Sequence, residues 1–293
     1  MGHPDHIWQS DIPKLAFAHP FLLHQVLAMA AFHLAYLAPG PGPLRRQHLA
    51  QASHHQNSAI QGIRGALADL TPDNCHALFP ASSLLSVGAL AERAEPFLHD
   101  SDAGGGTDPP TIEHLLDVFL LAKGIGSVMG SSASLLFKGP LRGLLASTAT
   151  EGPHPALERL MVQLHNFSDR LGALPPETKH TETIRAAVVA FVQATQGALS
   201  MTDHPEQHLI GAWPMMVTDE FIALLRRRNQ MALALLAYFC VIMWHASKLG
   251  CWFVDGWGLR VLREIDGVMS PPWNEESAWA LAWIASLATT TAR

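Results

Sequence analysis

Histidine is the side chain in this sequence best suited to chemistry at neutral pH, because its ordinary pKa is roughly 6.5. The chain has 17 histidines. His245 follows an apolar run over 231–244 and precedes Trp252, Asp255 and Trp257. An imidazole with a carboxylate in reach can act as a general acid or base, whereas a histidine that only satisfies the core is the alternative interpretation. His245 and Asp255 are therefore the candidate catalytic residues if the chain is an enzyme.

Two other histidines lie within an apolar helical pattern. His24 and His33 are about 2.5 helical turns apart, so they face nearly opposite directions and cannot share a metal ion. Either one could be a single polar group in a cavity. His54 and His55 stand side by side in a polar helical pattern, which is typical of a solvated surface.

Metal and cofactor motifs are missing from the sequence. The chain has only Cys75, Cys240 and Cys251, with no CxxC pair, so we expect no structural zinc site and a reducing compartment. The sequence has no phosphate-binding P-loop, no HExxH zinc motif and no GxSxG nucleophile turn. We therefore expect no metal and no cofactor.

Tryptophans gather near the C-terminus. Six of the eight lie within the last 50 residues, and such rings either build a core or line a cavity for a flat apolar ligand. The candidate ligand-binding residues are His24, His33, Trp244, His245, Trp252, Phe253 and Trp257.

Helical periodicity runs along the whole chain, and no segment alternates with the period of a strand. The prediction is an all-α protein: one large domain over 1–293, with about ten or more helices. A Gly/Pro-rich linker at 100–110 divides two helical layers. The expected helices are 19–38, 44–70, 72–93, 111–129, 155–171, 176–200, 218–228, 230–249, 252–266 and 275–288.

Composition limits the classes of function. Of the 293 residues, 48% are hydrophobic and 15% are charged, against roughly 25% charged in an average domain, which excludes a disordered chain. The net charge of −6 argues against binding of nucleic acid by this chain alone. No signal peptide is visible, and the apolar run 231–244 is shorter than the roughly 20 residues of a membrane span. We expect an intracellular protein, in the cytoplasm or the nucleus and not secreted, with 231–247 as a buried core helix.

Several segments carry a family resemblance. They are IPKLAFAHPFLLHQVLAMAAFHLAYL at 12–37, PDNCHALFPASSLLSVGAL at 72–90, AWP to LREI at 212–265, and the W…AWALAWI pattern at 273–284. In order and spacing they resemble the regulatory domain of fungal binuclear zinc-cluster transcription factors, of the sterol-sensor-like subgroup. The region 95–210 matches weakly.

The resemblance implies an all-helical domain, often dimeric, that binds a lipid in an apolar pocket. A hydrophobic small molecule and a second copy of the chain are the implied partners. His245, Trp252, Phe253, Gly256, Trp257 and Gly258 would belong to the C-terminal segment that closes the pocket. The six-cysteine zinc cluster and basic linker are not in this sequence, so we expect either an excised regulatory domain or a natural protein without its DNA-binding half.

Two functions follow. The first is a transcription-factor-like regulatory domain that binds a sterol or another lipophilic metabolite, with binding shifting a conformational equilibrium. The second is a stand-alone, cofactor-independent enzyme of fungal secondary metabolism, such as a cyclase, dehydratase, isomerase or pericyclase. It would use His245 and Asp255 as acid–base groups, with His24 and His33 as further candidates.

Overall fold

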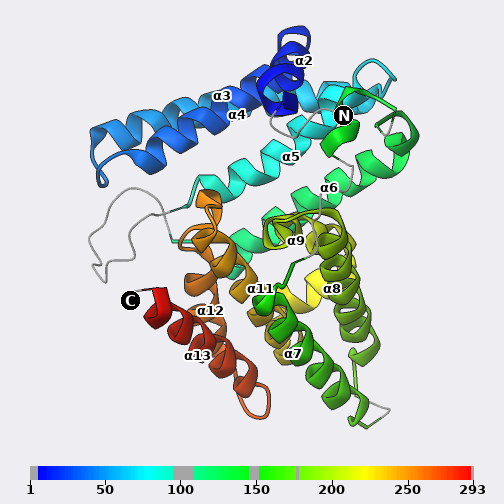
Figure 1. Ribbon diagram of the computed structural model, residues 1–293, viewed down its shortest axis with the longest axis vertical. Coiled ribbons are helices and arrows are strands. Elements are labelled where there is room, and N and C mark those ends of the chain that lie inside the picture. The colour runs from blue at the N-terminus through cyan, green and yellow to red at the C-terminus, as the bar shows by residue number, and fades with distance from the viewer. Residues whose placement is uncertain (1–5, 95–108, 137, 145–151, 176–177, 292–293) are drawn as a thin grey trace. The chain divides into compact units, whose positions relative to one another are not determined.

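The computed structural model describes residues 6–94, 109–136, 138–144, 152–175 and 178–291 (Figure 1). Every regular element in these ranges is a helix, which confirms the all-α prediction. The predicted linker at 100–110 lies outside the described residues except for its last two. The chain divides into two compact units, and each is described separately below. The single-domain assignment stays a prediction.

Unit 1 comprises residues 1–109 and 118–146 and holds the first helices of the chain. Its elements are η1 (Ile7–Asp11), α2 (Ile12–Ala18), α3 (Pro20–Leu37), α4 (Pro43–Ala68), α5 (Cys75–Ala91), most of α6 (Ile112–Leu136) and η2 (Pro140–Leu144).

The α3 helix packs against α4 and α5, and its buried face includes small side chains. Ala28, Ala31 and Ala35 are buried, whereas Leu27 and Leu34 on the neighbouring stripe are exposed. Small residues at a contact shorten the distance between helix axes. The alanine stripe therefore determines which face of α3 is buried in unit 1.

Unit 2 comprises residues 110–117 and 147–293. Its elements are the first turn of α6, then α7 (Pro155–Gly172), α8 (Thr181–Met201), α9 (Pro205–Met216), α10 (Asp219–Arg226), α11 (Gln230–Lys248), η3 (Trp252–Val254), α12 (Trp257–Val268) and α13 (Asn274–Thr291). Every residue of α11 from Met231 to Trp244 is buried, which confirms the prediction of a core helix. The helices α8, α9, α10, α12 and α13 all pack against α11.

Two helices among the described residues have the length and apolar composition of a membrane span. They are α3 and α11, but 83% of the relevant window of α11 is buried inside the protein, as expected of a core helix. The corresponding window of α3 is 33% buried. Length and composition alone are weak signs of a span, because a buried core helix meets the same criteria.

The junction between α11 and α12 depends on glycines. Gly250, two residues beyond the end of α11, has φ +98°. The N–H of Cys251 donates to the Ala246 carbonyl at 3.0 Å. Gly256 has φ +82° and precedes α12. Because both conformations lie in the left-handed region that favours glycine, the chain turns here. The helix predicted over 252–266 is therefore wrong in its first part, which forms the short η3 and a turn.

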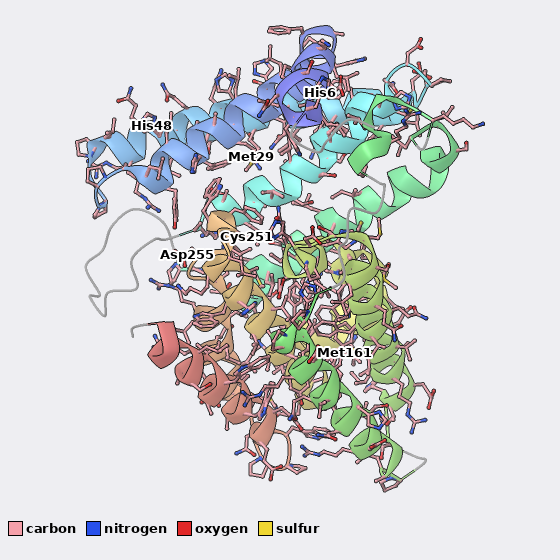
Figure 2. The ribbon with its side chains drawn as sticks, in the orientation of Figure 1. His6, Met29, His48, Met161, Cys251 and Asp255 are labelled. Atoms are coloured by element: carbon pink, nitrogen blue, oxygen red, sulfur yellow. The ribbon has the colours of Figure 1, made fainter. Side chains whose placement is uncertain are left out.

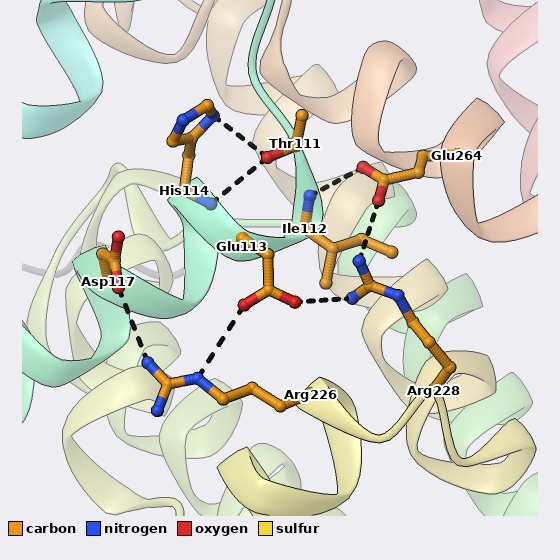
Figure 3. Close-up of polar contacts among 8 residues, drawn as sticks. All are labelled: Thr111, Ile112, Glu113, His114, Asp117, Arg226, Arg228 and Glu264. Carbon is orange, nitrogen blue, oxygen red and sulfur yellow. Dashed lines mark hydrogen bonds and ion pairs between the residues drawn. The ribbon is translucent and has the colours of Figure 1, made fainter.

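Carboxylates and arginines fix the first turn of α6 in unit 2 (Figure 3). One oxygen of Glu264 accepts the Ile112 N–H at 2.7 Å, and the other accepts from Arg228 at 3.1 Å. Arg228 also lies 3.2 Å from Glu113, and Arg226 lies 3.6 Å from Asp117. The arginine run at 226–228 thus contributes two partners to an ion-pair cluster.

Glu264→Ala is expected to loosen the α6 start, because the Ile112 N–H loses its acceptor and Arg228 loses one of its two carboxylate partners. A hydrogen bond to a charged group contributes roughly 1.5–3 kcal/mol, so amide exchange at Ile112 should accelerate about tenfold or more. Hydrogen-exchange mass spectrometry of the 111–117 segment measures this. Asp117→Asn is the matched control, since the Asp117 side chain is 69% exposed. Unchanged exchange in Glu264→Ala would contradict the anchoring role.

Candidate functional site

His245 lies in the last turn of α11, where it faces a carboxylate from another helix. Its Nδ1 is 3.3 Å from Oε1 of Glu206, which stands in the first turn of α9. The side chain of Glu206 is 6% exposed. The contact is within ion-pair distance, and the buried Nδ1 of His245 faces the carboxylate directly.

The environment keeps Glu206 ionised. Burial raises the pKa of this carboxyl, but the contact with His245, the backbone N–H of Glu206 and the charges of His245 and His154 together lower it below its ordinary value. The site therefore presents a buried negative charge next to an imidazole, an arrangement in which a carboxylate orients a histidine.

Cys251 is the third polar group at this site. It is 6% exposed, and burial followed by the charge of Glu206 raises the pKa of its thiol to about 11. The thiol is therefore protonated at neutral pH and is a weak donor rather than a nucleophile. Figure 2 labels Cys251 together with Asp255, four residues further along the same turn.

Asp255 has a different set of contacts from Glu206. Its Oδ1 accepts the N–H of Gly256 at 3.1 Å and lies 3.9 Å from Nζ of Lys248. Lys248 in turn lies 5.7 Å from the ring centroid of Trp244. The carboxylate found beside His245 is Glu206, which sequence reasoning missed.

The predicted aromatic residues gather around the same end of α11. Trp257 is fully buried and Trp244 is 7% exposed, so both are core residues. Trp252 and Phe253 are half-buried on η3, with ring centroids 6.1 Å apart and nearly perpendicular. Of the four predicted aromatic residues, only these two keep exposed ring surface with which to contact another molecule.

His24 and His33 belong to unit 1, on α3. Nδ1 of His24 is 2.9 Å from Nδ1 of His55 on α4, so one ring donates to the other. His55 is thus part of a contact between helices and not only a solvated side chain. His33 is exposed and stacks near Tyr36, with centroids 6.5 Å apart.

The His24–His55 pair predicts acid sensitivity. Burial, then the charges of His24 and His54, lower the pKa of His55 below 6.5. The folded state thus binds this proton less readily, so the stabilisation is present above the unfolded pKa and is lost as pH falls through the lowered folded pKa. Between about pH 7.5 and about pH 5.5, the urea midpoint should fall less in His55→Asn than in the wild type. His33→Asn is the control, and an identical pH dependence in His55→Asn would contradict the assignment.

Within the described ranges, no group of three or more His, Cys, Asp or Glu side chains is arranged to hold a metal ion.

Comparison with known proteins finds similarity to Zn(2)-C6 fungal-type transcription factors and to sterol uptake control proteins. No family model matches the chain, and no solved structure matches it. A Zn(2)-C6 fungal-type transcription factor of Gibberella zeae is 25% identical over 280 residues, which is 90% of this chain and 52% of the relative. The Zn(2)-C6 fungal-type transcription factor afumD of Aspergillus fumigatus is 26% identical over 233 residues, 77% of this chain and 57% of the relative.

A shorter segment matches more strongly. Sterol uptake control protein 2 of Candida albicans is 37% identical over 90 residues, 31% of this chain and 12% of the relative. The chain thus spans only part of the length of these relatives. Over most of its own length, the chain is related to fungal transcription factors of the Zn(2)-C6 type.

Proposed function

We propose that this chain is the regulatory part of a fungal transcription-factor-like protein and that it binds a hydrophobic small molecule, a sterol or another lipophilic metabolite. Two matches carry the proposal. A segment of 90 residues is 37% identical to a sterol uptake control protein, and most of the chain is similar to a fungal transcription factor. The proposed place of action is inside the cell, in the nucleus or the cytoplasm. A homodimer belongs to the same proposal.

The end of α11 in unit 2 is the proposed binding region. Ligand sites are mostly apolar with a few placed polar groups, and this region combines the half-buried rings of Trp252 and Phe253 with the Glu206–His245 pair. A ligand that prefers one of two conformations would shift their populations, which is how binding can become a regulatory signal.

A second candidate is a cofactor-independent enzyme, and the Glu206–His245 contact favours it. A carboxylate beside an imidazole is an arrangement that can move a proton on a bound substrate. His245 would be the acid or base and Glu206 its positioning residue. Asp255 stays a candidate from the sequence alone.

One experiment separates the two functions. The purified chain is incubated with a lipophilic fungal extract, and the bound and free molecules are identified by mass spectrometry. Recovery of a bound molecule unchanged supports regulation. Conversion of a molecule that stops in His245→Ala but continues in His165→Ala supports the enzyme, since His165 is a surface residue with a 78% exposed side chain. No enrichment of any lipophilic molecule would contradict both.

A further inference from the structure

The α3 helix of unit 1 exposes an apolar stripe with the spacing of a helix–helix contact. Leu27, Ala30, Leu34 and Leu37 are all exposed, and the three leucines are 39%, 50% and 62% exposed in chain order. Successive members differ by 3, 4 and 3 positions, which keeps them on one side of a helix, like the core positions of a coiled coil. These four residues are called the α3 stripe below.

The opposite side of α3 forms part of the core of unit 1. Leu22, Ala28, Phe32 and Ala35 are buried, and α3 packs against both α4 and α5 (Figure 1). At about 100° per residue, the buried side and the α3 stripe point in nearly opposite directions. A single exposed leucine is ordinary on a protein surface, whereas a contiguous apolar row marks a surface that contacts another molecule.

The charge of α3 favours a protein partner over a lipid surface. The helix contains no Asp, Glu, Lys or Arg. Helices that lie on a membrane surface are rich in Lys and Arg on their polar face, and α3 has neither. Two copies of α3, in contrast, can meet at the stripe without burying a charged side chain, which is the costly step in forming an interface.

The order of residues in the α3 stripe fits a second copy of the same stripe. The steps of 3, 4 and 3 read the same in both directions, so two antiparallel copies of α3 place Leu27 opposite Leu37 and Ala30 opposite Leu34. Each Leu34 then lies over the small side chain of Ala30, and large residues facing small ones is how packed layers interdigitate. The same surface meets itself across a two-fold axis, as an isologous dimer requires.

We infer that the α3 stripe is an interface between two copies of this chain, with their α3 helices antiparallel. The inference deepens the proposed function, because it assigns a surface to the proposed homodimer. A standard interface involves roughly 20–30 residues on each side, so a contact centred on four side chains predicts a weak dimer. We expect monomer and dimer to exchange in the micromolar range of chain concentration.

Sedimentation velocity of the full chain, at a series of micromolar concentrations, measures the dimer. Leu34→Glu should raise its dissociation constant about tenfold or more, because each new carboxylate would lose its water opposite Ala30 of the other copy. Val162→Glu is the matched control, since Val162 is a 59% exposed aliphatic residue on α7 in unit 2. This control should dimerise like the wild type.

A pair of variants tests the antiparallel arrangement. Leu27→Glu and Leu37→Lys should each weaken the dimer when studied alone. An equimolar mixture of the two should associate again, because the antiparallel arrangement places the two opposite charges face to face. Circular dichroism checks that both variants keep their helices, as expected for substitutions at exposed positions.

The outcomes distinguish the surface from the proposed function. A wild-type chain that stays monomeric overturns the inference and the homodimer, and leaves the proposed ligand binding standing. A dimer that Leu34→Glu does not weaken overturns the α3 surface alone, and a mixture that does not associate overturns the antiparallel arrangement. Flotation of the wild-type chain with vesicles of phosphatidylcholine and phosphatidylserine, lost in Leu34→Glu, would assign the stripe to a lipid surface and overturn the inference.

Discussion

Glu276→Ala is expected to lower the free energy of unfolding of unit 2 by about 3 kcal/mol, because a buried hydroxyl and a half-buried guanidinium both lose their partner. Glu276 is 6% exposed on α13, where it accepts hydrogen bonds from the Tyr238 hydroxyl of α11 and from Arg170 of α7. Arg170 also donates to the Pro272 carbonyl at 2.9 Å and lies 4.9 Å from the ring centroid of Trp273.

The loss is large because the buried Tyr238 hydroxyl and the half-buried Arg170 lose their acceptor together. Burial and the charge of Glu276 raise the pKa of Tyr238, so its hydroxyl stays protonated and needs an acceptor. Without Glu276, the Tyr238 hydroxyl is left unpaired and Arg170 loses its most buried partner.

Urea unfolding followed by tryptophan fluorescence measures this effect, since all tryptophans except Trp8 belong to unit 2. Glu275→Ala is the matched control: Glu275 lies 3.6 Å from the same arginine, but its side chain is 75% exposed. Exposed pairs contribute about 0–1 kcal/mol. Equal effects of the two variants would contradict the account of the network.

Gly258→Ala is expected to destabilise unit 2 by about 3 kcal/mol, at the upper end of the usual cost of overpacking. A Cβ at position 258 would lie 2.4 Å from the Cys240 carbonyl oxygen and 2.7 Å from the Trp244 backbone nitrogen. Both atoms are α11 backbone, so no side chain can move aside and α12 must shift away from α11. The change should also weaken ligand binding. A shift of α12 would displace the preceding η3, which carries Trp252.

Gly267→Ala is the control on the same helix, since a Cβ there meets no atom within 4 Å. Alanine in place of glycine in an open helical position stabilises by about 0.4–1 kcal/mol. The two urea midpoints should therefore move in opposite directions. A neutral Gly258→Ala would show that α11 and α12 do not approach as closely as described.

Local signals in the sequence predicted most of the helices but not all of their limits. The run of apolar residues over 231–244 was sufficient to predict a core helix, because no other element can bury so continuous a segment. The α9 helix was missed, since Pro205 and Pro214 in one short segment resemble a loop. The break before Trp257 depends on the left-handed conformation of Gly256, and a glycine in the sequence does not show its φ angle.

Of the two residues that meet at the site, the sequence predicted His245 but not Glu206. His245 stood out because an imidazole after a long apolar run is unusual and has aromatic neighbours in the sequence. Its partner Glu206 lies 39 residues earlier and follows a proline at a helix start, where an acidic residue is ordinary because it complements the helix dipole. Only the packing of α9 on α11 brings the two together.

Native mass spectrometry of the purified chain with ergosterol tests the central proposal most directly. The account predicts a complex that saturates at one sterol per chain. Gly267→Ala should retain the complex, and Gly258→Ala should weaken it. Failure of the wild-type chain to form a saturable complex, up to the solubility limit of the sterol, would contradict the account.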